Sequence, residues 1–445
     1  MKPKKFNIIG LILLTLTIGC KEQKFENNTS EKSRNQKWNE DIAYFESEYL
    51  NESKTFPKDS IADCKLVLSN LKLQIDSLTD NQIVLQLSRC VAMANNGHTT
   101  IHLSSMDKIP LRFYWFKEGL YIIKTDSSSK QYLGSKILEI NSIKTDSVFR
   151  HLKPYLSGIE SFKKFTATNY LASPQILNGI GLAAKDSMSL TLLRAKDTLT
   201  VSFRVKEMSN SKYEYESWND LYPDQAHDNS WQYLLDNNDS LPLYLKKMNE
   251  GVFYSFLDSE KIAYFSINAL WYKAPDFKGL IDDFLDELKN KTDYNVVIDL
   301  RYYTGGNYLK PTKLATKPPK IIDKNRKIYL ITSPMTFSAG LVTAARVKYF
   351  AKDKAVVVGE EVGDNLVFWA EGDYYKTPNF KIGIQDSKYK HDWKDDSFSL
   401  GKTFWVNKFY GVPAKDLKVD KKIELSYEDY LNEKDPILEW IINQE

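Results

Sequence analysis

The chain has 445 residues, of which 42% are hydrophobic, and this is enough for two or three domains with substantial cores. Its 61 basic and 58 acidic side chains leave a formal net charge of only +3. Because no lysine- or arginine-rich stripe accompanies that small charge, the composition argues against a nucleic-acid partner.

The N-terminus predicts a signal peptide. Three lysines within the first five residues precede an apolar run over residues 8–18, which ends at Gly19-Cys20. That run is too short for a membrane span. A small residue before a cysteine, followed by polar residues, resembles a bacterial lipoprotein cleavage site. The resemblance implies that residues 1–20 are a lipoprotein signal peptide, with Cys20 lipidated and held at the periplasmic face or the cell surface. An ordinary signal peptide that contains a cysteine is the alternative.

Residues 21–37 are polar and predict a flexible tether. Residues 38–105 predict a helical module, because apolar residues recur there at three- and four-residue steps. Cys64 and Cys90 both lie in this module, and an exported compartment permits a disulfide between them. Separate buried thiols are the alternative, since the spacing does not reveal the geometry.

The helical module ends at an Asn-Asn-Gly break just before His98. This places His98 at an exposed turn between a helix and an extended segment, where a histidine can act as a general base. A surface-loop histidine is the alternative. His102 follows four residues later in an extended segment, a spacing that does not make a metal pair, and no cysteine or carboxylate cluster supports zinc. We therefore expect neither a metal nor another cofactor.

Residues 106–205 show the alternation of strands and predict a β-rich module. The segment 132–141 resembles a PDZ-type module, whose usual task is to add a peptide strand to its own sheet edge. Residues 206–250 are aromatic and acidic, and they predict a linker or cover loop.

Residues 251–445 alternate strands and helices, which predicts a layered α/β core. The apolar run 295–300 is typical of a central strand buried on both faces. Gly305 and Gly306 follow that strand, and glycines at a strand's end let backbone N–H groups approach a ligand closely.

Ser338 lies where a second β-rich run, residues 328–331, gives way to a small-residue helix beginning near Ala339. The first helical N–H groups and the positive end of the helix dipole therefore lie beside its hydroxyl. This is a suitable place for a nucleophile. A serine that only caps the helix is the alternative.

Three landmarks follow one another in the C-terminal block: Asp299-Leu-Arg301 with Gly305-Gly306, Thr336-Phe-Ser-Ala-Gly340, and Val357-Val-Gly-Glu360. In residues, order and spacing they resemble the tail-specific and tricorn-core (S41) family of serine peptidases, from about His98 to the C-terminus. The resemblance implies a crotonase-like α/β peptidase core with a PDZ-like module and an N-terminal helical piece. It also implies that Ser338 is the nucleophile.

Members of that family differ in their catalytic base. Tail-specific members use a lysine shortly after the third landmark, but residues 360–365 contain none. Tricorn-like members use a histidine in a Gly-His-Thr context, which His98 matches. The resemblance thus implies acyl transfer, in which His98 takes the Ser338 proton and backbone N–H groups of Gly305 or Gly306 and of Ala339 hold the oxyanion.

Two positions depart from the family pattern. Tyr303 stands where the family has an asparagine, and Lys408 stands where a tricorn-like glutamate would orient the histidine. Glu361 and Asp364 are candidate substitutes for that glutamate.

The sequence therefore favours an exported serine endopeptidase that acts on protein or peptide substrates. The alternative is a weak or inactive protein of the same fold that binds peptides or apolar ligands. An α/β-hydrolase esterase falls behind both, because Thr336 stands where a nucleophile elbow needs glycine.

Overall fold

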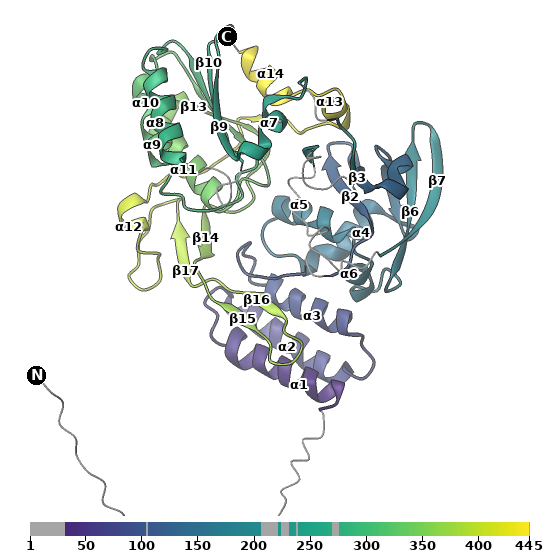
Figure 1. Ribbon diagram of the computed structural model, residues 1–445. Helices are drawn as coiled ribbons and strands as arrows, with labels where there is room; N and C mark the ends of the chain where they lie inside the picture. Colours follow the sequence, from purple (N-terminus) through teal and green to yellow (C-terminus); the bar gives the residue numbers. More distant parts are fainter. Residues whose placement is uncertain are drawn as a thin grey trace, which may run out of the picture.

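The computed structural model describes residues 32–103, 106–205, 221–223, 231–236, 239–268 and 276–444 (Figure 1). The predicted signal peptide, Cys20 and most of the predicted tether lie outside these residues, as does much of the predicted cover loop. A search of the described helices finds none long and apolar enough to cross a membrane.

The chain begins with a helical bundle made of α1 (Arg34–Tyr44), its π-helical continuation η1 (Phe45–Leu50), α2 (Lys58–Gln74) and α3 (Asp80–Ala92). Capping boxes begin α1 at Ser33 and α3 at Thr79. A disulfide joins Cys64 of α2 to Cys90 of α3, so the two cysteines are paired and are not separate thiols.

A β-rich sheet follows, with strand order β2-β3-β4-β6-β7. Its strands are β2 (Leu111–Phe116), β3 (Gly119–Asp126), β4 (Lys136–Ile140), β6 (Ser187–Arg194) and β7 (Asp197–Arg204). Short strands β5 (Ile143–Lys144) and β8 (Trp231–Tyr233) pair with β4 and β3. Between β5 and β6 the chain forms α4 (Thr145–Leu152), α5 (Glu160–Tyr170) and α6 (Pro174–Gly179). The helical bundle and this sheet bury their apolar side chains in one continuous core.

The C-terminal part is built on a six-stranded sheet of order β18-β13-β12-β11-β10-β9. The strands are β9 (Val252–Leu257), β10 (Ile262–Ile267), β11 (Asn295–Asp299), β12 (Ile328–Thr332), β13 (Ala355–Gly359) and β18 (Lys421–Lys422). All neighbours are parallel except the pair β9 and β10. The central strands β10, β11 and β12 are buried throughout, as their apolar sequences predict.

Helices cover both faces of this sheet. On one face lie α8 (Phe277–Leu288), α9 (Thr312–Thr316) and α11 (Ala339–Ala351), which share a core with alternate residues of the strands. On the other face α14 (Pro436–Ile442) packs on Val297, Tyr329 and Ile331. The predicted layered α/β fold is confirmed.

Segments far apart in the chain pack together and join the N-terminal and C-terminal halves of the molecule. Strands β15 (Tyr374–Lys376) and β16 (Gly383–Gln385) come from the C-terminal half but lie across the helical bundle, where β16 pairs with β1 (Thr100–Ile101) (Figure 1). The Trp38 ring of α1 stacks on Phe380 between these two strands, with centroids 3.9 Å apart. Described parts of the predicted cover loop, including Leu221 and Tyr244, pack between β2 and Met335 of the C-terminal half.

Candidate active site

The turn that carries Ser338 connects β12 to α11, and it is tied to the end of the neighbouring strand β11. The Thr336 hydroxyl donates to the Leu300 carbonyl over 2.9 Å, and the Ser333 hydroxyl donates to the Arg301 carbonyl. Because parallel strands end at the same edge of a sheet, the two strand-ending turns meet there, as in other open α/β sheets.

Ser338 occupies the N-cap position of α11, but its side chain makes no capping hydrogen bond. Its backbone has φ 51° and ψ −117°, a conformation that a non-glycine residue adopts only under strain of about 1–3 kcal/mol. Such strain often marks functional positions, where the surrounding structure holds it. The half-buried hydroxyl is therefore left available for chemistry and does not serve as a helix cap.

The glycine turn after β11 lies directly beside this serine. A Cβ placed on Gly305 would be 3.6 Å from Ser338 Cβ and 3.9 Å from its Oγ. The Phe337 N–H donates to the Tyr303 carbonyl over 3.2 Å, and a Cβ on Gly340 would come within 2.0 Å of that same carbonyl oxygen. Glycine at position 340 is thus required for the two turns to pack.

The N–H groups predicted to hold an oxyanion lie in these same two turns. Ala339 is the first residue of α11, so its N–H has no intrahelical acceptor. Within the part of the chain that the structure describes, the backbone N–H groups of Gly305, Gly306 and Ala339 donate to no other backbone group or side chain. They are free for an oxyanion formed next to Ser338.

Tyr303, which stands where the family pattern has an asparagine, has its side chain in the α/β core. Its side chain is completely buried in the α/β core with residues of α11, and burial raises its pKa well above the usual value of a tyrosine. Only its backbone carbonyl, which accepts from Phe337, belongs to the turn.

His98 follows α3 and lies against the residue that precedes Ser338. Its ring stacks on Phe337 with centroids 4.4 Å apart, and on Phe368 of β14 (Val367–Ala370) at 5.1 Å. The side chain is only 12% exposed, so the prediction of an exposed turn is wrong, because these two rings enclose the imidazole.

A carboxylate faces this histidine. His98 Nδ1 lies 3.5 Å from Asp364 Oδ2, and the Asp364 side chain is 2% exposed. Among the described residues, neither ring nitrogen of His98 has a hydrogen-bond partner, the Ser338 hydroxyl included, and Asp364 Oδ2 has none either. Catalytic hydrogen bonds are often long in the absence of substrate, so this geometry is compatible with a base awaiting its substrate.

Of the two candidate orienting carboxylates, the structure therefore brings Asp364 to the histidine. The loop after β13 holds it there, since the Gly363 N–H donates to the Thr336 carbonyl over 3.0 Å. Glu361 is exposed and lines a separate cavity. Lys408, on α12 (Asn407–Tyr410), is also exposed.

His391 of β17 (Tyr389–Asp392) also stacks on Phe368, with centroids 4.9 Å apart, and no local sequence pattern singles it out. Burial, and secondarily the charge of His98, lowers the pKa of His391 to about 3. Its two nitrogens are buried with no partner among the described residues. It is thus a neutral ring that packs on Phe368, as His98 does. Only tertiary proximity could have indicated it.

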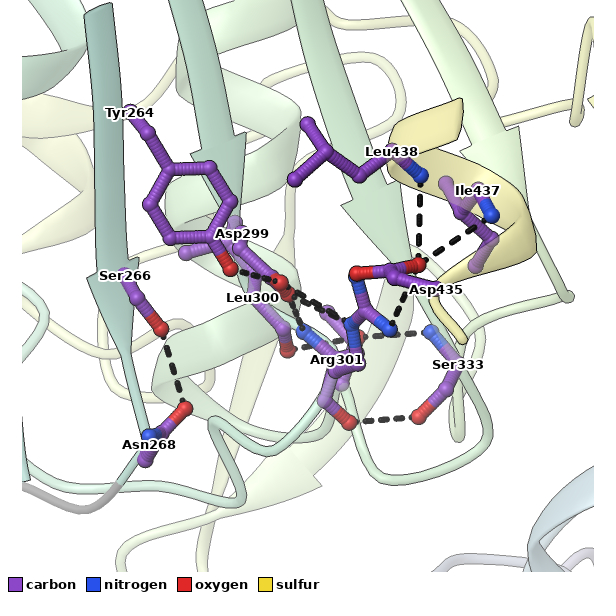
Figure 2. A network of polar contacts seen from close by, with 11 residues as sticks. Tyr264, Ser266, Asn268, Asp299, Leu300, Arg301, Ser333, Asp435, Ile437 and Leu438 are labelled. Atoms are coloured by element: carbon purple, nitrogen blue, oxygen red, sulfur yellow. Dashed lines mark hydrogen bonds and ion pairs between the residues drawn. The ribbon is translucent and has the colours of Figure 1, made fainter. Parts of the chain in front are cut away.

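A buried ionic network adjoins the serine turn, to which it is linked by the hydrogen bond from Ser333 to the Arg301 carbonyl (Figure 2). Arg301 donates through Nε to Asp299 and through its terminal nitrogens to Asp435, at 2.8 Å for the shorter contact. Asp435 also accepts the first N–H groups of α14, and the Tyr264 hydroxyl donates to Asp299. The Asp-Leu-Arg landmark is therefore structural, because it fastens the C-terminal helix to the edge of the sheet that carries the two turns.

A search of the described residues finds no group of three or more histidines, cysteines and carboxylates that could hold a metal ion.

Comparison with known proteins shows the fold and little else. No protein-family model matches the chain, and no curated protein matches it. Among solved structures, mature CPAF complexed with lactacystin has a TM-score of 0.56 and 10% identity, over 92% of this chain and 97% of that chain. Mature CPAF alone also has a TM-score of 0.56 and 10% identity, over 92% and 96%. The photosystem II D1 C-terminal processing protease matches with a TM-score of 0.35 and 9% identity, over 89% and 94%. The chain therefore shares the fold of CPAF over nearly its whole length.

Proposed function

We propose that this protein is an exported serine endopeptidase that hydrolyses peptide bonds through an acyl-enzyme on Ser338. One observation carries the proposal. Ser338, which is strained and makes no capping hydrogen bond, lies against Gly305. His98, with Asp364 3.5 Å away, lies against Phe337, the residue before Ser338. Nucleophile, oxyanion donors, base and orienting carboxylate come from four separate segments and meet at one edge of the sheet.

In the proposed mechanism, His98 takes the Ser338 proton as the hydroxyl oxygen attacks the scissile carbonyl. Asp364 holds the imidazole through Nδ1 and stabilises the imidazolium that forms. The N–H groups of Gly305 or Gly306 and of Ala339 bind the oxyanion, and loss of one such donor typically lowers the rate by about a hundredfold or more. Protonated His98 then protonates the leaving amine, and water attacks the acyl-enzyme with His98 as base.

Export and anchoring belong to the same proposal. A disulfide such as Cys64–Cys90 persists in oxidising compartments and is rare in the cytosol. Together with the lipoprotein-like segment that ends at Cys20, it supports a location in the cell envelope, with the enzyme attached to a bacterial membrane by lipid.

Intact-mass analysis of protein extracted from membranes tests the anchor. We expect a chain that begins at a diacylated Cys20, whereas a soluble, unmodified chain would contradict the anchor without affecting the proposed chemistry.

The catalytic proposal is tested by labelling the folded protein with a fluorophosphonate probe, which reacts with activated serines. We expect labelling of the wild type, none of Ser338→Ala, and strongly reduced labelling of His98→Ala. Ser69→Ala, which changes an exposed serine of α2, is the matched control and should label like the wild type. Labelling that survives Ser338→Ala would show that another residue reacts with the probe and would contradict Ser338 as the nucleophile. A folded wild type that does not label favours the alternative of an inactive binding protein.

A further inference from the structure

A cavity of about 260 Å³ lies beside the serine turn, between that turn, β2 and α5. Its apolar wall is made of Tyr114, Phe116, Phe165, Pro334 and Met335. Met335 stands three residues before Ser338, so its Cα lies at most about 11 Å from that of the nucleophile. An extended peptide advances about 3.4 Å per residue. A substrate side chain two or three residues from the scissile bond can therefore reach this cavity.

Glu360 supplies a carboxylate to the cavity from a rigid position at the end of β13. Its N–H donates to the Thr332 carbonyl over 2.9 Å, and the Thr332 hydroxyl donates back to the Glu360 carbonyl over 2.7 Å. The carboxylate itself has neither an ion pair nor a hydrogen bond with any described residue. Burial raises its pKa to about 7, with a further contribution from Glu424 and opposing contributions from Lys164 and Lys422.

The other charged side chains that line the cavity either have a partner other than Glu360 or are exposed. Lys422 pairs with Glu424 at 3.4 Å, and the Lys164 ammonium lies over the Trp115 ring, 5.1 Å from its centroid. Glu160 pairs with Lys153 outside the cavity. Lys117 and Glu361 are exposed. Glu360 is thus a partly enclosed carboxylate of this cavity that forms no ion pair with any described cation, although Lys164 and Lys422 lie near enough to lower its pKa.

We propose that this cavity is a substrate subsite for a lysine or arginine side chain, whose aliphatic stem packs on the aromatic wall and whose cationic head pairs with Glu360. Long basic side chains bury their stems in this way while the charged head finds a carboxylate. The proposal rests on the peptidase function proposed above and specifies its substrate class.

The experiment uses internally quenched peptides in which each of the three positions on either side of the scissile bond is varied in turn among lysine, arginine, norleucine and glutamate. Norleucine keeps the stem of lysine without its charge. At one of these positions we expect kcat/KM for lysine or arginine to exceed that for norleucine by about tenfold or more, because a partly buried charge pair is at stake. Glu360→Gln should remove this preference, so that kcat/KM for the lysine peptide falls to within about twofold of kcat/KM for the norleucine peptide measured on the same variant.

Glu160→Gln is the matched control, since Glu160 lines the same cavity but already pairs with Lys153. It should keep the preference for basic residues. Labelling of Ser338 by fluorophosphonate is measured on the same samples, so that failure of the subsite is distinguished from failure of the peptidase. A wild type that labels but shows no basic preference, or that prefers glutamate, overturns the subsite whether or not Glu360→Gln folds.

Discussion

At the scale of single residues, Asp364 lies 3.5 Å from His98 Nδ1 and can serve as the orienting carboxylate of the proposed mechanism. It reaches the imidazole from a loop that is itself fastened to the serine turn. A carboxylate in this position favours the tautomer with the proton on Nδ1, which leaves the other nitrogen free to accept the proton of the serine.

We expect Asp364→Asn to keep the fold and to lower kcat/KM by on the order of a hundredfold or more, because an amide holds the wrong tautomer and cannot stabilise the imidazolium. The rate of fluorophosphonate labelling measures this directly. Glu361→Gln, three residues away and exposed, is the control and should label at the wild-type rate. If Asp364→Asn also labels at that rate, Asp364 has no orienting role.

The buried His391 predicts a pH dependence of stability. Its pKa is about 3 in the folded protein and about 6.5 in the unfolded chain, so between these values the unfolded state binds more protons. Above pH 6.5 the histidine is neutral in both states, and the protein keeps its full stability with respect to this group. Between pH 7 and pH 5 the unfolded chain takes up the proton, so the free energy of unfolding falls by about 2 kcal/mol.

His391→Phe should remove that part of the pH dependence. The new ring suits a position that already contacts Phe368 and Phe404, and it replaces two unpartnered nitrogens. Urea denaturation at pH 5 and pH 7 gives the comparison, with His151→Gln, at an exposed position of α4, as the control. An unchanged difference between the two pH values in His391→Phe would show that this histidine is not the titrating group.

At the scale of elements, the site depends on two strand-ending turns that pack almost without side chains between them. Gly340 on α11 meets the carbonyl of Tyr303, and Gly305 meets Ser338. Both glycines lie where the two turns meet. There is no room for a side chain at Gly340, so glycine is needed there for packing, whereas a methyl group at Gly305 would fit but would lie beside the serine hydroxyl.

We expect Gly340→Ala to destabilise the protein by about 1–3 kcal/mol or more, because its Cβ would lie 2.0 Å from a backbone oxygen that cannot move without its strand. Gly305→Ala has ordinary contact distances and should leave thermal unfolding nearly unchanged while it slows labelling of Ser338, since its methyl group enters the oxyanion site. Calorimetry and probe labelling on both variants test this. Equal stabilities, or equal labelling rates, would contradict the assignment of the two roles.

An element could be predicted from the sequence when the residues that specify it are neighbours along the chain. Residues 328–331 and the small residues after them specify strand, turn and helix within about twenty positions, so the place of Ser338 was predictable. The Gly-Gly pair after residues 295–300 is equally local. The enclosure of His98 was not predictable, because Phe337 and Phe368 stand more than 200 positions away along the chain.

At the scale of the whole molecule, the C-terminus completes the structure beneath the site. Asp435 caps α14 and pairs with Arg301, which in turn pairs with Asp299 at the end of β11 (Figure 2). All three side chains are buried, so their charges depend on one another for compensation.

We expect Asp435→Ala to lower the free energy of unfolding by about 3–5 kcal/mol, because it leaves a buried guanidinium short of one partner and removes a helix cap. Chemical denaturation measures the loss. Asp293→Ala, which breaks the exposed pair with Lys261, is the control and should change the stability little. A similar loss in free energy of unfolding in both variants would mean that the buried network stabilises the protein no more than an exposed ion pair does.

Local patterns in the chain were sufficient for the layered α/β core, for the serine between strand and helix, and for the histidine after a helix break. These depend on periodicity, turn residues and helix ends, each of which acts over a few neighbouring positions. The pairing of Cys64 with Cys90, the choice of Asp364 over Glu361, the ring stack around His98 and the position of Glu360 were decided only by the tertiary structure. Each depends on the distance between segments that are far apart in the chain, and that distance is set by how the helices, sheets and loops pack together.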